Sequence, residues 1–74
     1  MKILNYNIPE ELFLRYIMAI KNLQVLRNMN PKYYADMDVH RASIHNEILK
    51  LLNVERDNYE FKQAFAEHVE KYLY

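Results

Sequence analysis

The sequence predicts an all-α fold: a compact three-helix up-down-up bundle with a short extended N-terminal segment. Apolar residues recur at helical spacing, cap signals divide the chain into three long segments, and both prolines stand where a helix is expected to begin. We expect helices at about 9–28, 31–52 and 55–73, in a single domain that spans residues 1–74. Because the turns between them are short, each helix should run antiparallel to its neighbour in the sequence.

The first helix is expected to follow an asparagine cap. Asn7 precedes Pro9 in the first turn, and Glu10 stands three residues after Asn7, which is capping-box spacing. Residues 1–8 contain too few residues for another helix, so we expect them to lie extended across the bundle. This segment should bury Ile3, Leu4 or Tyr6.

The second helix has a predicted start and a predicted stop. Asn30 followed by Pro31 is typical of an N-cap and a first helical residue. Asn53 suits the left-handed position after the last turn, and Val54 should then contact Leu49 in a Schellman motif. Between these signals one face is apolar, through Tyr33, Tyr34, Met37, Ile44, Ile48, Leu51 and Leu52.

The third helix is expected to begin within residues 55–57. Asp57 and Glu60 have the spacing of a second capping box. The apolar face that follows is formed by Phe61, Phe65, Val69 and Tyr72.

Composition excludes several functional classes. The chain has 74 residues, with ten Lys and Arg, ten Asp and Glu, no Cys and no Gly. Zero cysteine excludes disulfide scaffolds and Cys-based zinc sites, and zero glycine excludes P-loops and dinucleotide fingerprints. A net charge of zero makes nucleic-acid binding an unfavoured function. With no long apolar run, we expect neither a signal peptide nor a membrane span, and a cytoplasmic location without a cofactor.

The first helix is apolar on two sides. Its main stripe holds Leu12, Phe13, Tyr16, Ile17, Ile20, Leu23 and Leu26. A second stripe, which we call the outer stripe, consists of Leu14, Met18 and Val25. Either residues 1–8 fold over the outer stripe, or a homodimer or another helix-groove contact covers it, or its members are separately exposed.

Two polar residues stand within apolar faces and are candidates for buried polar groups. Arg41 lies in the stripe of the second helix, where it either reaches the solvent with its charged end or pairs with a carboxylate of another helix. His68 lies on the apolar face of the third helix. We expect it to be a core histidine bonded to the backbone or to a tyrosine hydroxyl, with a pH-sensitive or ligand role as the alternative.

A weak polar strip follows one edge of the second helix, formed by Asp36, His40, Ser43 and Glu47. Histidine and carboxylates are suitable metal ligands and proton-transfer groups. A solvated edge has the same pattern, however, and one helix supplies too few ligands for a tetrahedral site. We therefore expect no metal site and no catalytic residue here.

These observations favour a small helical interaction or regulatory module without catalytic activity. A domain of this size has a small core, so association with a protein partner or with itself as a homodimer is expected. The alternative is a helix-turn-helix-like DNA-binding regulator, in which the second or third helix would enter the major groove.

Overall fold

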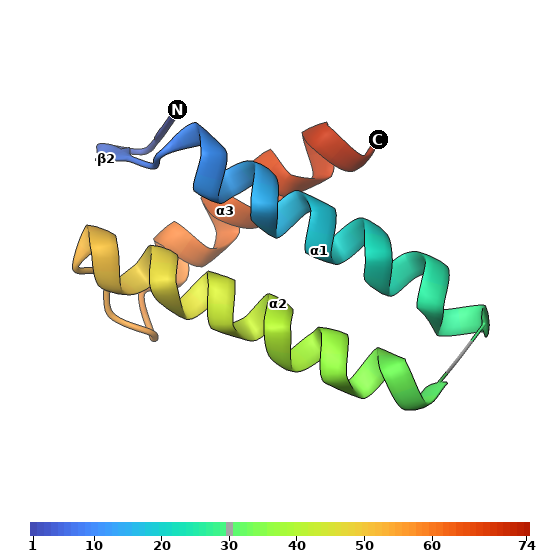
Figure 1. The fold of residues 1–74 in the computed structure, drawn as a ribbon. Helices are drawn as coiled ribbons and strands as arrows, with labels where there is room; N and C mark the ends of the chain where they lie inside the picture. Colours follow the sequence, from blue (N-terminus) through green and yellow to red (C-terminus); the bar gives the residue numbers. More distant parts are fainter. Residues whose placement is uncertain (30) are drawn as a thin grey trace.

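The computed structural model describes residues 1–29 and 31–74, and within these ranges it contains three helices preceded by a small hairpin (Figure 1). The helices α1 and α2 lie side by side and antiparallel, and α3 crosses behind α1. The predicted all-α three-helix fold is confirmed. The elements are β1 (Lys2–Ile3), β2 (Tyr6–Asn7), α1 (Glu10–Met29), α2 (Pro31–Leu52) and α3 (Tyr59–Leu73).

The N-terminal segment, which the sequence predicts to be extended, folds back on itself as a two-stranded hairpin. Lys2 pairs with Asn7 and Ile3 with Tyr6 in antiparallel register. The two-residue loop between the strands requires a left-handed residue, and Leu4 supplies it with φ 54°. Ile3 is fully buried, as predicted, whereas Leu4 is exposed. The turn therefore directs one aliphatic side chain inward and the next one outward.

The first helix is displaced by one residue from its predicted range. The Pro9 carbonyl accepts the first helical hydrogen bond, from the Phe13 amide at 3.1 Å. Asn7, the predicted cap, lies in β2 instead. Ile8 closes the hairpin by donating its amide to the Met1 carbonyl at 2.8 Å and accepting from the Met1 ammonium at 3.1 Å. The capping box predicted for Asn7 is therefore wrong, because strand pairing holds this residue away from the helix.

The second helix has its predicted bounds, although the cap predicted at Asn30 lies outside the described residues. Its end is the predicted Schellman motif, in which Asn53 has φ 56°. The Val54 amide donates to the Leu49 carbonyl at 2.9 Å, and the Asn53 amide donates to the Lys50 carbonyl at 3.2 Å. Val54 and Leu49 are both buried. Asparagine thus ends a helix in a chain without glycine.

The third helix begins four residues later than predicted, because Asn58 and not Asp57 is the cap. The Asn58 side-chain oxygen accepts from the Phe61 amide at 3.1 Å. The preceding residues form a turn, in which the Asn58 amide donates to the Glu55 carbonyl at 3.2 Å. Phe61, in the first turn, is fully buried. The prediction was wrong because both residues can cap a helix, and spacing alone does not choose between them.

The core lies where α3 crosses the first half of α1. Phe65 packs edge-on against Phe13 at 5.7 Å and against Tyr16 at 5.1 Å between ring centroids. The hairpin covers the start of α3, where Tyr6 packs edge-on against Phe61 at 5.4 Å. One cluster unites the buried residues of all these elements: Ile3, Ile8, Leu12, Phe13, Tyr16, Ile17, Ala19, Ile44, Ile48, Leu49, Val54, Phe61, Phe65 and Val69.

The pair formed by α1 and α2 extends beyond the part that α3 covers (Figure 1). At 1.5 Å per residue, α3 is about 22 Å long, whereas α1 and α2 are about 30 and 33 Å long. Towards the connection between α1 and α2, large apolar side chains are exposed, among them Val25, Met29 and Tyr33. The third helix therefore completes only part of the bundle.

The cap assignment predicts unequal effects for two neighbouring substitutions. Asn58→Ala should lower the free energy of unfolding by about 1 kcal/mol, because it leaves the Phe61 amide without its side-chain acceptor. Asp57→Ala, the matched control, should change it by less than about 0.5 kcal/mol. Urea unfolding followed by circular dichroism measures both. A larger effect of Asp57→Ala would place the cap where the sequence predicted it.

Candidate interaction surface

The outer stripe remains uncovered along α1. Leu14, Met18 and Val25 are 40%, 56% and 58% exposed. The N-terminal hairpin packs instead on α3, where β1 contacts the third helix. The alternative in which residues 1–8 fold over the outer stripe is therefore wrong, because Ile3 and Tyr6 find their partners in the core.

Part of the outer stripe borders a groove between α1 and α2. This groove has a volume of about 700 Å³. At 100° per residue, Leu14 and Met18 lie about 100–160° around α1 from Phe13 and Tyr16, which contact α3. The groove thus opens away from α3. Its lining is Leu14, Met18, Ala19, Met37 and Ile44, with Glu10, Glu11, Arg15, Asn22 and His40 around them.

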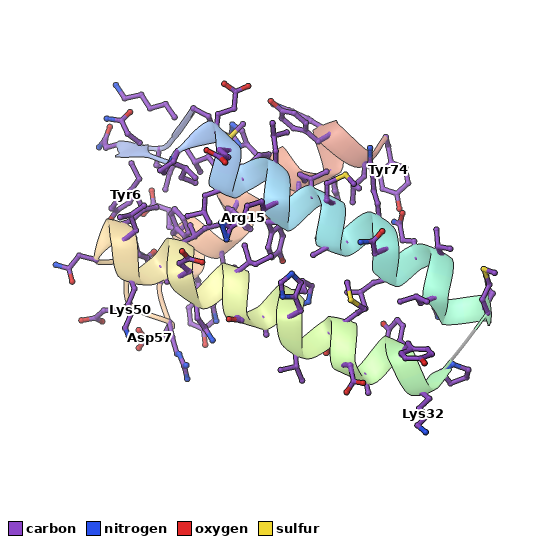
Figure 2. The ribbon with its side chains drawn as sticks, in the orientation of Figure 1. Tyr6, Arg15, Lys32, Lys50, Asp57 and Tyr74 are labelled. Carbon is purple, nitrogen blue, oxygen red and sulfur yellow. The ribbon has the colours of Figure 1, made fainter. Side chains whose placement is uncertain are left out.

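An ion pair joins α1 to α2 beside this groove. Arg15 extends from α1 towards α2 (Figure 2), where its guanidinium lies 3.7 Å from the Glu47 carboxylate. Both side chains are more than half exposed, so the pair contributes little to stability. The pair does show that Arg15 of α1 and Glu47 of α2 lie at the same height along the two antiparallel helices. The apolar floor beyond it includes two methionines, Met18 and Met37, whose flexible side chains adapt to the shape of a partner.

The polar strip predicted on α2 does not converge on one point. All four of its residues are exposed, and His40 lines the groove. Ser43 and Glu47 line a second depression of about 850 Å³, formed by the opposite side of α2 and the turn before α3. Within residues 1–29 and 31–74, no three His, Asp or Glu side chains gather closely enough to hold a metal ion.

Arg41 joins α2 to α1 through a tyrosine and not through a carboxylate of another helix. Its Nε donates to Asp38 of the same helix at 2.9 Å, and its Nη1 donates to the Tyr16 hydroxyl at 3.3 Å. Arg41 is partly buried, so the prediction of a buried polar group overstates its burial. Burial alone lowers the pKa of Arg41, but the hydrogen bonds to Tyr16 and Asp38 outweigh it and raise the pKa. The side chain therefore stays charged.

His68 has the structural role that the sequence predicts, although it too is only partly buried. Its Nδ1 lies 3.0 Å from the Ala64 carbonyl one turn earlier. Because a carbonyl can only accept, Nδ1 carries the proton. The expected bond to the backbone is confirmed.

A second histidine stands at the junction of all three helices. The His45 ring of α2 lies 5.9 Å from the Tyr16 ring of α1 and 5.5 Å from the Phe65 ring of α3. Burial lowers the pKa of His45, and the positive charges of Arg41 and Lys62 lower it further. His45 is consequently neutral near pH 7 and acts as part of the aromatic packing.

Sequence reasoning missed several residues of this surface. Met37 and Ile44 were assigned to the core stripe of the second helix, which is correct for Ile44 but leaves out the groove that both residues line. The hydrogen bond between Tyr16 and Arg41 had no sequence signal. The spacing of Asp38 and Arg41, three residues apart on one helix, could have identified their ion pair.

Comparison of the chain with protein-family models, with curated proteins and with solved structures finds no match. No helix in the described part of the chain has both the length and the apolar character needed to cross a membrane.

The environment of His45 predicts that stability depends on pH. Unfolded histidine titrates near pH 6.5, and folding lowers the pKa of His45 below that value. As the pH falls through 6.5, the unfolded state binds a proton that the folded state resists, so the free energy of unfolding decreases. The decrease ends below the folded-state pKa.

The substitution His45→Gln should remove this part of the pH dependence. Urea unfolding at pH 5 and pH 7.5 measures it. His40→Gln, at an exposed position, is the matched control and should retain the pH dependence. If the free energy of unfolding of His45→Gln fell between pH 7.5 and pH 5 by as much as that of the wild type, the assignment would be contradicted.

Divalent metals should not stabilise the fold. A ligand that binds only the folded state raises the melting temperature, and no set of ligands converges around His40. We expect equal melting temperatures with and without zinc or manganese. An increase that His40→Ala abolishes would establish a metal site on the polar strip.

Proposed function

We propose that this chain is a small helical protein-interaction module that acts by associating with itself, without catalytic activity. The observation that carries the proposal is the exposed outer stripe of α1, formed by Leu14, Met18 and Val25. These side chains lie at helical spacing on one face, and two of them border the groove. An exposed apolar surface of this kind is typical of an interaction site.

The size of the domain supports a second copy as the partner. A single core of this size stabilises a fold by only about 3–5 kcal/mol, and α3 leaves one side of α1 and α2 open. Burying an exposed apolar side chain stabilises an interface, and a symmetric dimer buries every contact twice. We expect a dissociation constant in the micromolar range.

The alternatives from other classes have less support. As a recognition helix, α3 would carry three glutamates and only two lysines, and α2 has equal numbers of acidic and basic side chains. Both compositions disfavour contact with phosphates. An enzyme would need an acid, base or nucleophile set that converges in a cleft, whereas half of the groove lining is aliphatic or methionine and its polar residues stand around that apolar floor. The absence of cysteine is compatible with a reducing location such as the cytoplasm.

Met18→Glu should weaken self-association at least tenfold, because it places a carboxylate within the apolar surface. Light scattering on a size-exclusion column, from about 10 to 500 μM protein, measures the mass. Val39→Glu is the matched control: Val39 is 71% exposed on α2 but does not line the groove, so this variant should dimerise like the wild type.

Two results would contradict the proposal. The first is a wild-type mass of about 9 kDa at every concentration. The second is a dimer that Met18→Glu leaves intact, which would move the interface away from the outer stripe. Tight binding of mixed duplex DNA at about 150 mM salt would favour the DNA-binding alternative.

A further inference from the structure

We infer that the second copy covers the groove in one particular register: the two α1 helices lie antiparallel across a two-fold axis that passes between Leu14 and Met18. This inference rests on the proposed self-association. In this register Leu14 of each copy stands opposite Met18 of the other. The groove of each copy is then closed by the groove of the second, so that two α1 and two α2 helices form a four-helix layer.

The charges along α1 favour this antiparallel arrangement. Glu10, Glu11 and Lys21 flank the outer stripe, with the acidic pair before it and the lysine towards its other end. On the helical wheel Glu10 and Lys21 lie within about 20° of one another, on the same edge of the stripe. A two-fold axis perpendicular to α1 keeps residues of one edge together and reverses the direction of the helix. Each Lys21 is thereby placed beside Glu10 of the second copy.

The same axis brings unlike groups together on α2. The Arg15–Glu47 ion pair and the contacts of Tyr16 with Arg41 and His45 place the middle of α1 at the level of Ile44. His40 and Glu47 stand four and three residues from Ile44 in opposite directions, so His40 of each copy lies level with Glu47 of the other. His40 and Glu47, two residues of the polar strip, then stand near each other at the rim of the interface.

A parallel pairing lacks this complementarity. Its two-fold axis runs along the helices and exchanges the two edges of the stripe, so it would set Glu10 of each copy against Glu11 of the other and leave Lys21 without a carboxylate of α1 at its level. Like charges in opposition destabilise an interface. A parallel pairing would also align the dipoles of the paired helices in the same direction. The antiparallel register avoids both the opposition of like charges and the parallel alignment of the helix dipoles.

Cysteine cross-linking tests this register directly, since the natural chain has no cysteine. A mixture of Leu14→Cys and Met18→Cys should form the disulfide-linked heterodimer, because these positions are opposite and a disulfide requires Cα atoms about 4.4–6.8 Å apart. Val25→Cys alone should not cross-link with itself, because its two copies would stand about 27 Å apart along the helices. Mass spectrometry after mild oxidation identifies each product.

Charge reversal provides a second test. Lys21→Glu should raise the dissociation constant about threefold to tenfold, since it removes two exposed ion pairs. Combining it with Glu10→Lys in the same chain should restore much of the affinity. Lys71→Glu, on α3, reverses a matched charge away from the groove and should leave the dissociation constant unchanged.

The outcomes separate the register from the proposed function. A monomeric wild type would overturn both. A dimer that Met18→Glu disrupts, but in which Val25→Cys cross-links with itself, would support the interface and overturn the register. The heterodimer of Leu14→Cys and Met18→Cys, together with recovery by the charge swap, is the result that supports it.

Discussion

The aromatic junction between α3 and the first half of α1 determines how the rest of the molecule is arranged. Phe65 packs against Phe13 and Tyr16, and Phe61 anchors the first turn of α3 beneath the hairpin residue Tyr6. Every element of the chain contributes side chains to the cluster around these rings. Because α3, which begins after the Asn58 cap, is shorter than either partner helix, this junction is confined to one end and one side of α1 and α2.

The exposed surface is a consequence of that confinement. The hairpin is held on α3, so it leaves Leu14, Met18 and Val25 uncovered. The groove beside them opens on the side of α1 and α2 that faces away from α3. The three helices thus have one filled interface and one open surface, and the proposed dimer would cover the open one.

Features fixed by local interactions could be predicted from the sequence, whereas features fixed by packing between distant segments could not. Asn53 was predictable because a left-handed helix end is a local property, and in a chain without glycine asparagine is the best substitute. The sequence could not show whether Asn58 or Asp57 caps α3, because the burial of Phe61 decides between them. Arg41 and the groove depended on how α1 and α2 pack, which periodicity does not contain. The outer stripe could be identified in the sequence, but the sequence did not show that the hairpin leaves it uncovered.

The most direct test of a shared apolar surface uses the four methionines. In a dilution series of the methionine-methyl-labelled protein, NMR should show Met18 and Met37 shifting together along one dimerisation curve, because both line the groove. Met1, which packs against the core, should keep its position. Shifts that involve Met1 while Met18 and Met37 remain constant would contradict the account.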